Sequence, residues 1–293
     1  MKVLLTGARG FLGTYINNEL SKNNEVLTLS RNGAALRADI AKVVTNLPEV
    51  NLVVHCAGKA HSVPKTEEEK QAFFDINVKG TQNLLTALEI QLPNSFVFIS
   101  SVAVYGCESG FLINENHPLS ASDPYGQSKV QAEELISDWC KKHDVICSIL
   151  RLPLLVGEKP PGNLGAMIRG IDKGYYFNIA GGKARKSMVL ASDVAKIIPI
   201  VAERGGIYNL TDGYHPSFSE LSSFIGRTLG KETVFNMPFW IANVMGNLGN
   251  LFGNNAPINS KKLAKITADL TFDDSKAKKE LDWKPMPVLI GWK

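Results

Sequence analysis

Short, almost wholly apolar runs alternate with helical patterns through the first half of the chain. The runs have the length of strands and lie at 3–5, 26–29, 52–55, 96–99 and 145–150. After the first run, apolar residues recur at positions 11, 12, 15, 16 and 20, the spacing of one helix face. Strands without polar alternation are buried on both faces. The pattern therefore predicts an α/β fold, a doubly wound parallel sheet (Rossmann) with ligands at the carboxyl ends of its strands.

The rhythm changes after Arg151. Residues 157–162 form a turn cluster rich in glycine and proline, and helical patterns dominate from Asp212 onward. We therefore predict a larger sheet domain made of residues 1–158 and 187–212. The remaining residues, 159–186 and 213–293, are predicted to form a smaller, mostly helical lobe.

One stretch of that lobe, 237–253, is apolar but carries Asn243, Asn247 and Asn250. A buried or lid helix is the favoured interpretation, and a helix on a membrane surface is the alternative. No lysine or arginine lies on the stretch to meet anionic lipid.

Composition narrows the classes of function. The chain has 293 residues, with 44% hydrophobic and 20% charged, which excludes a disordered protein. The net charge of +4 permits an anionic ligand but indicates no nucleic acid partner. No run is long enough to predict membrane insertion. Four cysteines (56, 107, 140 and 147) lack metal-type spacing, so we expect no metal site and reduced thiols in a cytoplasmic protein.

A glycine-rich turn joins the first strand to the first helix. Gly7, Gly10 and Gly13 are spaced GxxGxxG, and Phe11 and Leu12 open the helix. Glycine tolerates positive φ and lets backbone N–H groups approach a pyrophosphate at the positive end of a helix. This placement predicts a dinucleotide-binding loop.

The second strand ends at Ser30 and Arg31, where an NAD-binding protein usually carries an acid for the ribose 2′-hydroxyl. Arginine suits a 2′-phosphate and serine supplies a hydroxyl. NADP(H) is therefore the favoured cofactor. NAD(H) is the alternative if Arg31 only stacks on adenine.

Tyr125 and Lys129 are four residues apart, so they share one face of a helix. An ammonium close to a phenol lowers the tyrosine pKa and makes it a proton donor or acceptor near neutral pH. Ser100 and Ser101 end the run at 96–99, at the edge of the sheet where ligands bind. The three residue types together predict proton transfer at a carbonyl or hydroxyl group.

Taken together, these motifs resemble those of the extended short-chain dehydrogenase/reductase superfamily, in its nucleotide-sugar epimerase/dehydratase branch. The matching segments are 6–13, 39–40, 55–58, 77–81, 99–106, 125–129 and 151–153. Their order and spacing hold along the chain. The resemblance implies an NAD(P)-binding domain followed by a substrate-binding lobe.

The resemblance also implies roles for individual residues. Ser101, Tyr125 and Lys129 would be catalytic, and helices around 73–88 and 125–143 would pair in a homodimer. The residues implied for cofactor binding are Gly7, Gly10, Phe11, Leu12, Gly13, Ser30, Arg31, Asp39, Ile40, Cys56, Ala57, Gly58, Asn77, Tyr125, Lys129 and Pro153. Those implied for substrate binding are Ser101, Asn163, Leu164, Arg185 and Lys186.

Lys59, Ala60 and His61, with the segments around 162–164 and 185–187, resemble a bacterial subgroup that acts on UDP-linked sugars for polysaccharide assembly. The resemblance implies hydride transfer at C4. A reductase of UDP-4-keto-6-deoxy-N-acetylhexosamines is favoured because Arg31 indicates a consumed NADPH. The alternatives are a UDP-hexose 4-epimerase that retains NAD and a non-catalytic NADP(H)-sensing module. Val102 and Ala103 stand where a 4,6-dehydratase needs an Asp-Glu pair, which argues against elimination.

Overall fold

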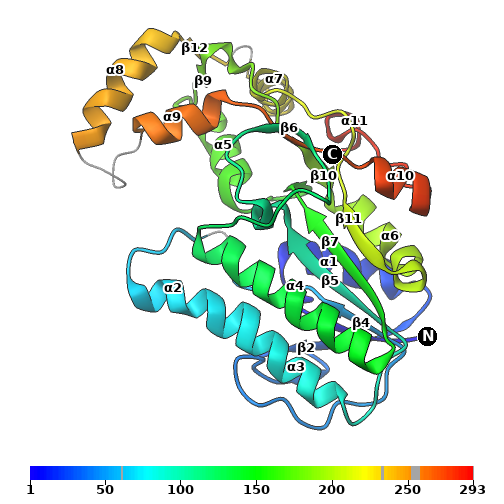
Figure 1. The fold of residues 1–293 in the computed structure, drawn as a ribbon. Coiled ribbons are helices and arrows are strands. Elements are labelled where there is room, and N and C mark those ends of the chain that lie inside the picture. Colours follow the sequence, from blue (N-terminus) through cyan, green and yellow to red (C-terminus); the bar gives the residue numbers. More distant parts are fainter. Residues whose placement is uncertain (61, 232–233, 252–257, 293) are drawn as a thin grey trace.

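The computed structural model describes residues 1–293 apart from 61, 232–233, 252–257 and 293. Among the described residues, seven parallel strands form one sheet in the order β11-β7-β5-β4-β1-β2-β3 (Figure 1). The strands are β1 (Lys2–Thr6), β2 (Glu25–Ser30), β3 (Leu36–Arg37), β4 (Leu52–His55), β5 (Ser95–Ser101), β7 (Ile146–Leu152) and β11 (Gly206–Asn209). The predicted doubly wound sheet is confirmed, and the strand order reverses at β1.

Helices cover both faces of this sheet because its strands are apolar on both sides. Val3 and Leu5 pack with one layer, whereas Leu4, between them, packs with the other. The first layer consists of α1 (Phe11–Leu20), α6 (Ala191–Arg204) and α10 (Ser275–Leu281). The second consists of α2 (Glu67–Phe74), α3 (Gly80–Leu88) and α4 (Pro124–His143). The two segments named for dimerisation lie side by side in this second layer (Figure 1), and the dimer stays a prediction.

The lobe is built on its own apolar core, which includes Val156, Met188, Leu221 and Ile225. Its helices are α5 (Gly162–Asp172), α7 (Phe218–Thr228), α8 (Phe239–Gly249), α9 (Ser260–Thr267) and α11 (Val288–Gly291). Short parallel strand pairs accompany them: β8 (Leu154–Val156) with β10 (Met188–Leu190), β9 (Asn178–Ile179) with β12 (Asn236–Met237), and β6 (Gly110–Ile113) with β13 (Leu270–Phe272). The helical character was predicted. The pairs were not, because strands of two to four residues leave no periodicity.

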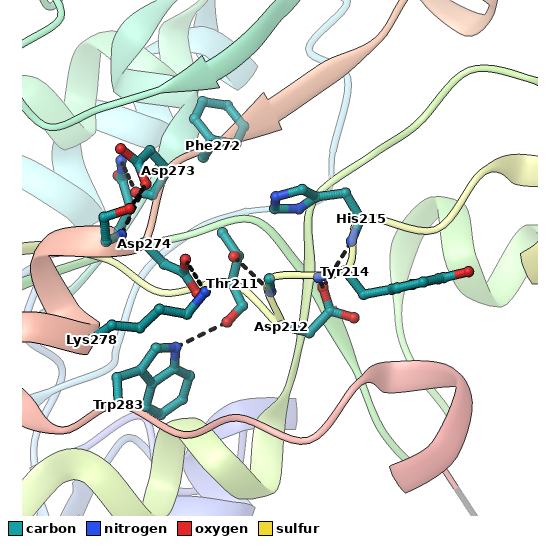
Figure 2. Close-up of polar contacts among 12 residues, drawn as sticks. Thr211, Asp212, Tyr214, His215, Phe272, Asp273, Asp274, Lys278 and Trp283 are labelled. Carbon is teal, nitrogen blue, oxygen red and sulfur yellow. Dashed lines mark hydrogen bonds and ion pairs between the residues drawn. The ribbon is translucent and has the colours of Figure 1, made fainter.

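The C-terminal segment returns to the sheet after passing through the lobe. Figure 2 shows the junction, where the indole N–H of Trp283 donates to the Thr211 carbonyl at 2.9 Å. Asp212 accepts the N–H groups of Tyr214 and His215 through one oxygen and that of Val288 through the other. Trp283 is buried in the same core as α1 and α6. The stretch 213–293, predicted for the lobe, therefore includes a part that packs on the sheet.

A buried ion pair lies at the carboxyl ends of the central strands. Arg151 of β7 and Glu133 of α4 meet at 2.7 Å, and their side chains are 3% and 4% exposed. Glu133 also accepts the hydroxyl of Ser100, whose register partner on the neighbouring strand is Arg151. Arg151 in turn donates to the Tyr105 hydroxyl at 3.2 Å, and Tyr105 donates to Asn209 of β11 at 2.7 Å. The network thus joins α4, β5, β7 and β11 through side chains.

Removing the charge of Glu133 should destabilise the protein strongly. In Glu133→Gln the Arg151 guanidinium stays buried without its counter-ion, which costs about 3–5 kcal/mol in the free energy of unfolding. Urea denaturation measures this loss. Lys142→Gln is the matched control, because Lys142 and Glu89 form an exposed pair at 3.9 Å, and should change stability by about 0.5 kcal/mol or less. Equal effects of the two variants would contradict the prediction.

Candidate active site

A cavity of about 370 Å³ opens at the carboxyl ends of β1, β4, β5 and β7. It collects residues that are far apart in the sequence. The predicted site residues that line it are Gly10, Phe11, Leu12, Cys56, Gly58, Ser101, Tyr125, Lys129 and Pro153. Across the described part of the chain, no group of three His, Cys, Asp or Glu side chains could hold a metal ion. The lining combines polar side chains, such as Tyr125 and Lys129, with apolar ones, such as Phe11 and Leu12.

The glycine loop packs too closely for side chains. Gly7 has φ +72°, and a Cβ there would lie 2.6 Å from the backbone nitrogen of Ala57. A Cβ on Gly13 would lie 2.0 Å from the Gly7 carbonyl oxygen. Gly10 precedes α1, and among the described residues no side chain caps this helix end. Its first N–H groups are thus available to an anionic group, and the loop fits a pyrophosphate.

The start of α4 positions Tyr125 and Lys129. The Asp123 carboxylate caps the helix by accepting the N–H groups of Tyr125 and Gly126, both at 3.1 Å, and Pro124 occupies the first helical position. Tyr125 and Lys129, one turn apart, both line the cavity. Ser101 ends β5 and accepts the N–H of Ala103 at 3.2 Å, which starts a 3₁₀ turn. The structure therefore brings the three predicted catalytic residues to one cavity.

Burial dominates the electrostatics of this set. It lowers the pKa of Lys129 to about 8, and the ammonium donates to the Ile99 carbonyl at 2.8 Å and lies 4.4 Å from the centre of the Phe98 ring. Burial also raises the pKa of Tyr125, and the hydrogen bond with Ser101 only partly opposes that rise. The expectation that the tyrosine pKa is lowered is thus wrong for this structure, because burial of the phenol outweighs the hydrogen bond that lowers its pKa.

The loop after β4 is held by buried polar groups. His55 is neutral, since burial lowers its pKa to about 3, and its ring contacts Thr6 at 2.7 Å and Thr81 at 3.0 Å. The Thr6 hydroxyl also accepts the N–H of Ala57 at 3.1 Å. Cys56, Ala57 and Gly58 are thereby fixed against the glycine loop, although Ala57 itself does not line the cavity.

Asn77 supports this loop from behind. It is buried in a π-helical turn, Asp75–Lys79, between α2 and α3. Its amide oxygen accepts the N–H of Lys59 at 2.7 Å, and its nitrogen donates to the Ser128 hydroxyl at 2.8 Å. Asn77 therefore ties the loop to α4 beside Lys129. Lys59 and Ala60 line the cavity, whereas His61 lies outside the described residues.

Arginines lie around the end of β2, outside the cavity that holds Ser101, Tyr125 and Lys129. Arg31 is exposed, and its carbonyl accepts from the Arg37 side chain at 3.1 Å. Ser30 donates to the Asn32 carbonyl at 2.7 Å, and Arg9 of the glycine loop donates to the same oxygen at 3.0 Å. Sequence reasoning missed Arg9. The available signal was an arginine between two glycines of the loop. Because the loop and the end of the second strand lie at the same edge of the sheet, such an arginine can reach the end of that strand.

Asp39 and Ile40 follow β3. The Asp39 carboxylate accepts the N–H of Ala41 at 3.1 Å, so it shapes a turn. Ile40 is buried against Gly80, at the start of α3. Neither residue lines the cavity.

The predicted substrate residues of the lobe lie outside the cavity lining formed by the described residues, to which Leu154, Leu155 and Pro161 contribute instead. Asn163 is exposed, and Leu164 is buried in the core of the lobe. Arg185 donates to the His215 carbonyl at 2.9 Å and lies 3.6 Å from Glu220.

The ammonium of Lys186 is occupied as well. It donates to the carbonyls of Lys265 and Ala268, at the end of α9. The Lys186 ammonium, predicted to bind substrate, is thus engaged by residues about eighty positions away. No local sequence pattern reveals such contacts.

The chain is similar to known proteins in sequence and in fold. The family described as "NAD dependent epimerase/dehydratase family" matches residues 3–211. The N-acetyl-alpha-D-glucosaminyl-diphospho-ditrans,octacis-undecaprenol 4-epimerase of Escherichia coli O157:H7 is 27% identical, over 94% of this chain and 88% of that relative. The UDP-glucose 4-epimerase of Vibrio cholerae is also 27% identical, over 98% and 92%. The solved structure of RMD from Pseudomonas aeruginosa, complexed with NADPH, has a TM-score of 0.74 at 20% identity, over 99% and 96%.

Replacing Lys129 by methionine should stabilise the ligand-free protein near neutral pH. Because the pKa of Lys129 falls from 10.5 to about 8 on folding, burying its charge costs about 3 kcal/mol at pH 7. Between those two values the unfolded chain binds more protons, so this cost to the wild type fades as the pH rises. The advantage of Lys129→Met over wild type, measured by thermal unfolding, should therefore shrink from pH 7 to about pH 10.

Lys141→Met, at an exposed position of the same helix, is the control for this measurement. Its effect on the free energy of unfolding should be about 0.5 kcal/mol or less. A difference between Lys129→Met and wild type that is independent of pH would refute the buried-charge interpretation.

Proposed function

Because the chain belongs to the NAD-dependent epimerase/dehydratase family, we propose that it transfers hydride at C4 of a hexose carried on a diphosphate, and that it epimerises this carbon. The observation that carries the proposal is the meeting of Ser101, Tyr125 and Lys129 in one cavity with the glycine loop. The names of both relatives, 4-epimerases that cover most of this chain, support it.

The residues present fit a nicotinamide dinucleotide. The loop with glycines at 7, 10 and 13 would hold its pyrophosphate, and Lys129 with Pro153 would hold its nicotinamide end. When bound, this group would supply the hydride acceptor and donor for C4. Tyr125 takes or gives the proton of the C4 oxygen, and Ser101 donates a hydrogen bond to that oxygen. Since positions 102–103 carry no carboxylate, elimination is not expected.

The diphosphate carrier differs between the two relatives. The name of the Vibrio cholerae protein gives a uridine nucleotide, and that of the Escherichia coli protein gives undecaprenol. We propose a UDP-linked sugar as the substrate. The assay therefore offers UDP-glucose, UDP-N-acetylglucosamine and N-acetylglucosaminyl-diphospho-undecaprenol, each with catalytic NAD, and identifies the sugar product by chromatography.

Tyr125→Phe should abolish epimerisation and leave cofactor binding intact. Loss of a positioned proton-transfer group lowers kcat by about 10²–10⁴-fold. Product formation and cofactor titration, measured on the same preparations, separate the two effects. Tyr175→Phe, at a tyrosine that is 60% exposed, is the matched control and should keep full activity. Near-normal turnover by Tyr125→Phe would exclude the proton role.

A 4-keto reductase is the second candidate, favoured by Arg9, Arg31 and Arg37 around the end of β2, where no acid stands. It predicts stoichiometric oxidation of NADPH by a UDP-4-keto-6-deoxy sugar. Arg31→Ala should lower kcat/KM for NADPH about tenfold or more, since a charge-assisted hydrogen bond is lost, with little change for NADH.

Steady-state kinetics with both cofactors decide this point. A preference of the wild type for NADH over NADPH would exclude the reductase as a candidate function. Tight NADPH binding without turnover of any of these sugars would leave a non-catalytic sensing module.

A further inference from the structure

Two of the four cysteines meet at the edge of the sheet opposite the cavity. Cys140 lies in the last turn of α4, and Cys147 is the second residue of β7. Both thiols are free, and both pack in the apolar layer between α4 and the sheet. The other two cysteines face different groups: Cys56 lines the cavity, and Cys107 lies 3.8 Å from Nε2 of His117.

Local structure directs the two side chains toward the same interface. Successive side chains of a strand point to opposite faces of the sheet. Ser148 donates to the Val201 carbonyl of α6, in the first layer of helices. Cys147 and Ile149, on either side of Ser148, pack in the second layer. Cys140 belongs to that layer as well and is only 1% exposed. The two thiols therefore face each other between α4 and β7, which lie against one another (Figure 1).

A tight connection keeps the two elements close. Asp144 ends α4 in the left-handed conformation, with φ +54°. The N–H of Val145 then donates to the Cys140 carbonyl at 2.9 Å, and β7 begins at the next residue, Ile146. The chain thus passes directly from the last turn of the helix into the strand, and this turn fixes the separation of Cys140 and Cys147.

The two thiols are not equivalent. They form a hydrogen bond in which Cys140 donates and Cys147 accepts, and this bond raises the pKa of Cys140 and lowers that of Cys147. The hydroxyl of Ser137, one turn earlier on α4, also lowers the pKa of Cys147, whereas burial and the Glu133 carboxylate oppose the change without reversing it. Cys147 is partly exposed and Cys140 is buried. Cys147 is therefore the thiol that ionises first and that an oxidant can reach.

We propose that Cys140 and Cys147 are a redox-active pair, which hydrogen peroxide closes to an intramolecular disulfide. The Cys147 thiolate attacks one oxygen of the peroxide, the O–O bond breaks, and a sulfenic acid forms on Cys147 while hydroxide leaves. The sulfur of Cys140 then attacks the sulfur of the sulfenic acid. The S–O bond breaks, and hydroxide leaves as the S–S bond forms. The two hydroxides take up the two thiol protons, so two thiols and one peroxide give one disulfide and two molecules of water.

The disulfide joins two elements that build the candidate active site. Sulfurs in a disulfide are about 2.05 Å apart, closer than two thiols in contact, so the last turn of α4 and the start of β7 draw together on oxidation. Tyr125 and Lys129 lie at the other end of α4, where they line the cavity. Oxidation thus fixes the far end of the helix that carries them and leaves the cavity itself free.

Peptide mapping of the full chain tests the pairing. The protein is treated with hydrogen peroxide, the remaining thiols are blocked with iodoacetamide, and the chain is cut with trypsin. Because Lys141 and Lys142 lie between the two cysteines, trypsin leaves Cys140 and Cys147 on separate peptides that only a disulfide holds together. We expect the intact wild type to lose the mass of two hydrogen atoms and to give this joined peptide, which dithiothreitol separates. Cys107→Ser, which removes another partly exposed thiol, is the control and should give the same joined peptide.

Single variants distinguish the two thiols. In Cys140→Ser the sulfenic acid of Cys147 has no partner, so dimedone should label Cys147. In Cys147→Ser the joined peptide and the dimedone label should both be lost, because the remaining Cys140 is buried. The proposal is overturned if the peroxide-treated wild type gives no joined peptide, if dimedone labels Cys140 in Cys147→Ser, or if the joined peptide arises only from a covalent dimer on a non-reducing gel. Peptide mapping needs no turnover, so its result is independent of the proposed activity.

Discussion

The buried pair of Arg151 and Glu133 is the constraint on which the arrangement of the site depends. Charges taken out of water are costly unless their hydrogen-bonding groups are satisfied. This pair is satisfied by Ser100 of β5 and Tyr105 beyond it, and so requires α4, β5 and β7 to be in register together. Two of the three catalytic candidates are next to a member of the network: Ser101 follows Ser100, and Lys129 lies one turn before Glu133. Packing that satisfies the pair therefore also sets the geometry of the cavity.

Lys129, in the same region, is a second group whose burial as a charge is unfavourable. Its ammonium is buried between a carbonyl and an aromatic ring, and no carboxylate of the described residues forms an ion pair with it. Such a placement is unfavourable for the folded state and is sustained by the apolar packing of the sheet on both faces. His55 on β4 is also buried, but it is neutral and serves as a hydrogen-bonding bridge. The site thus keeps a buried ammonium at Lys129 and a neutral imidazole at His55.

Local patterns predicted those parts of the structure that local physics decides. The apolar runs predicted the strands, and the four-residue spacing predicted the shared face of Tyr125 and Lys129. Long-range contacts decided the rest. Arg9 could be placed beside β2 only once the sheet order was known, and the hydrogen bonds of Asn77 depend on how the loop after β4 meets α4. The prediction for the pKa of Tyr125 failed for the same reason. The burial that raises this pKa and the hydrogen bond from Lys129 to the Ile99 carbonyl are both tertiary properties.

The interpretation of 237–253 shows most clearly what a pattern omits. Its spacing and asparagines are compatible with a buried helix, a lid or a surface helix, since each exposes a different side of the same cylinder. The small residues decide among them, as they let α8 approach α9 and leave the large ones outside. Lys186 then ties α9 to the rest of the lobe, because its ammonium donates to the carbonyls of Lys265 and Ala268 at the end of that helix. Lys261 of α9 adds a second tie through its ion pair with Glu108 at 3.5 Å. The orientation of the helix is therefore decided by contacts far apart in the sequence, which the apolar pattern of 237–253 does not contain.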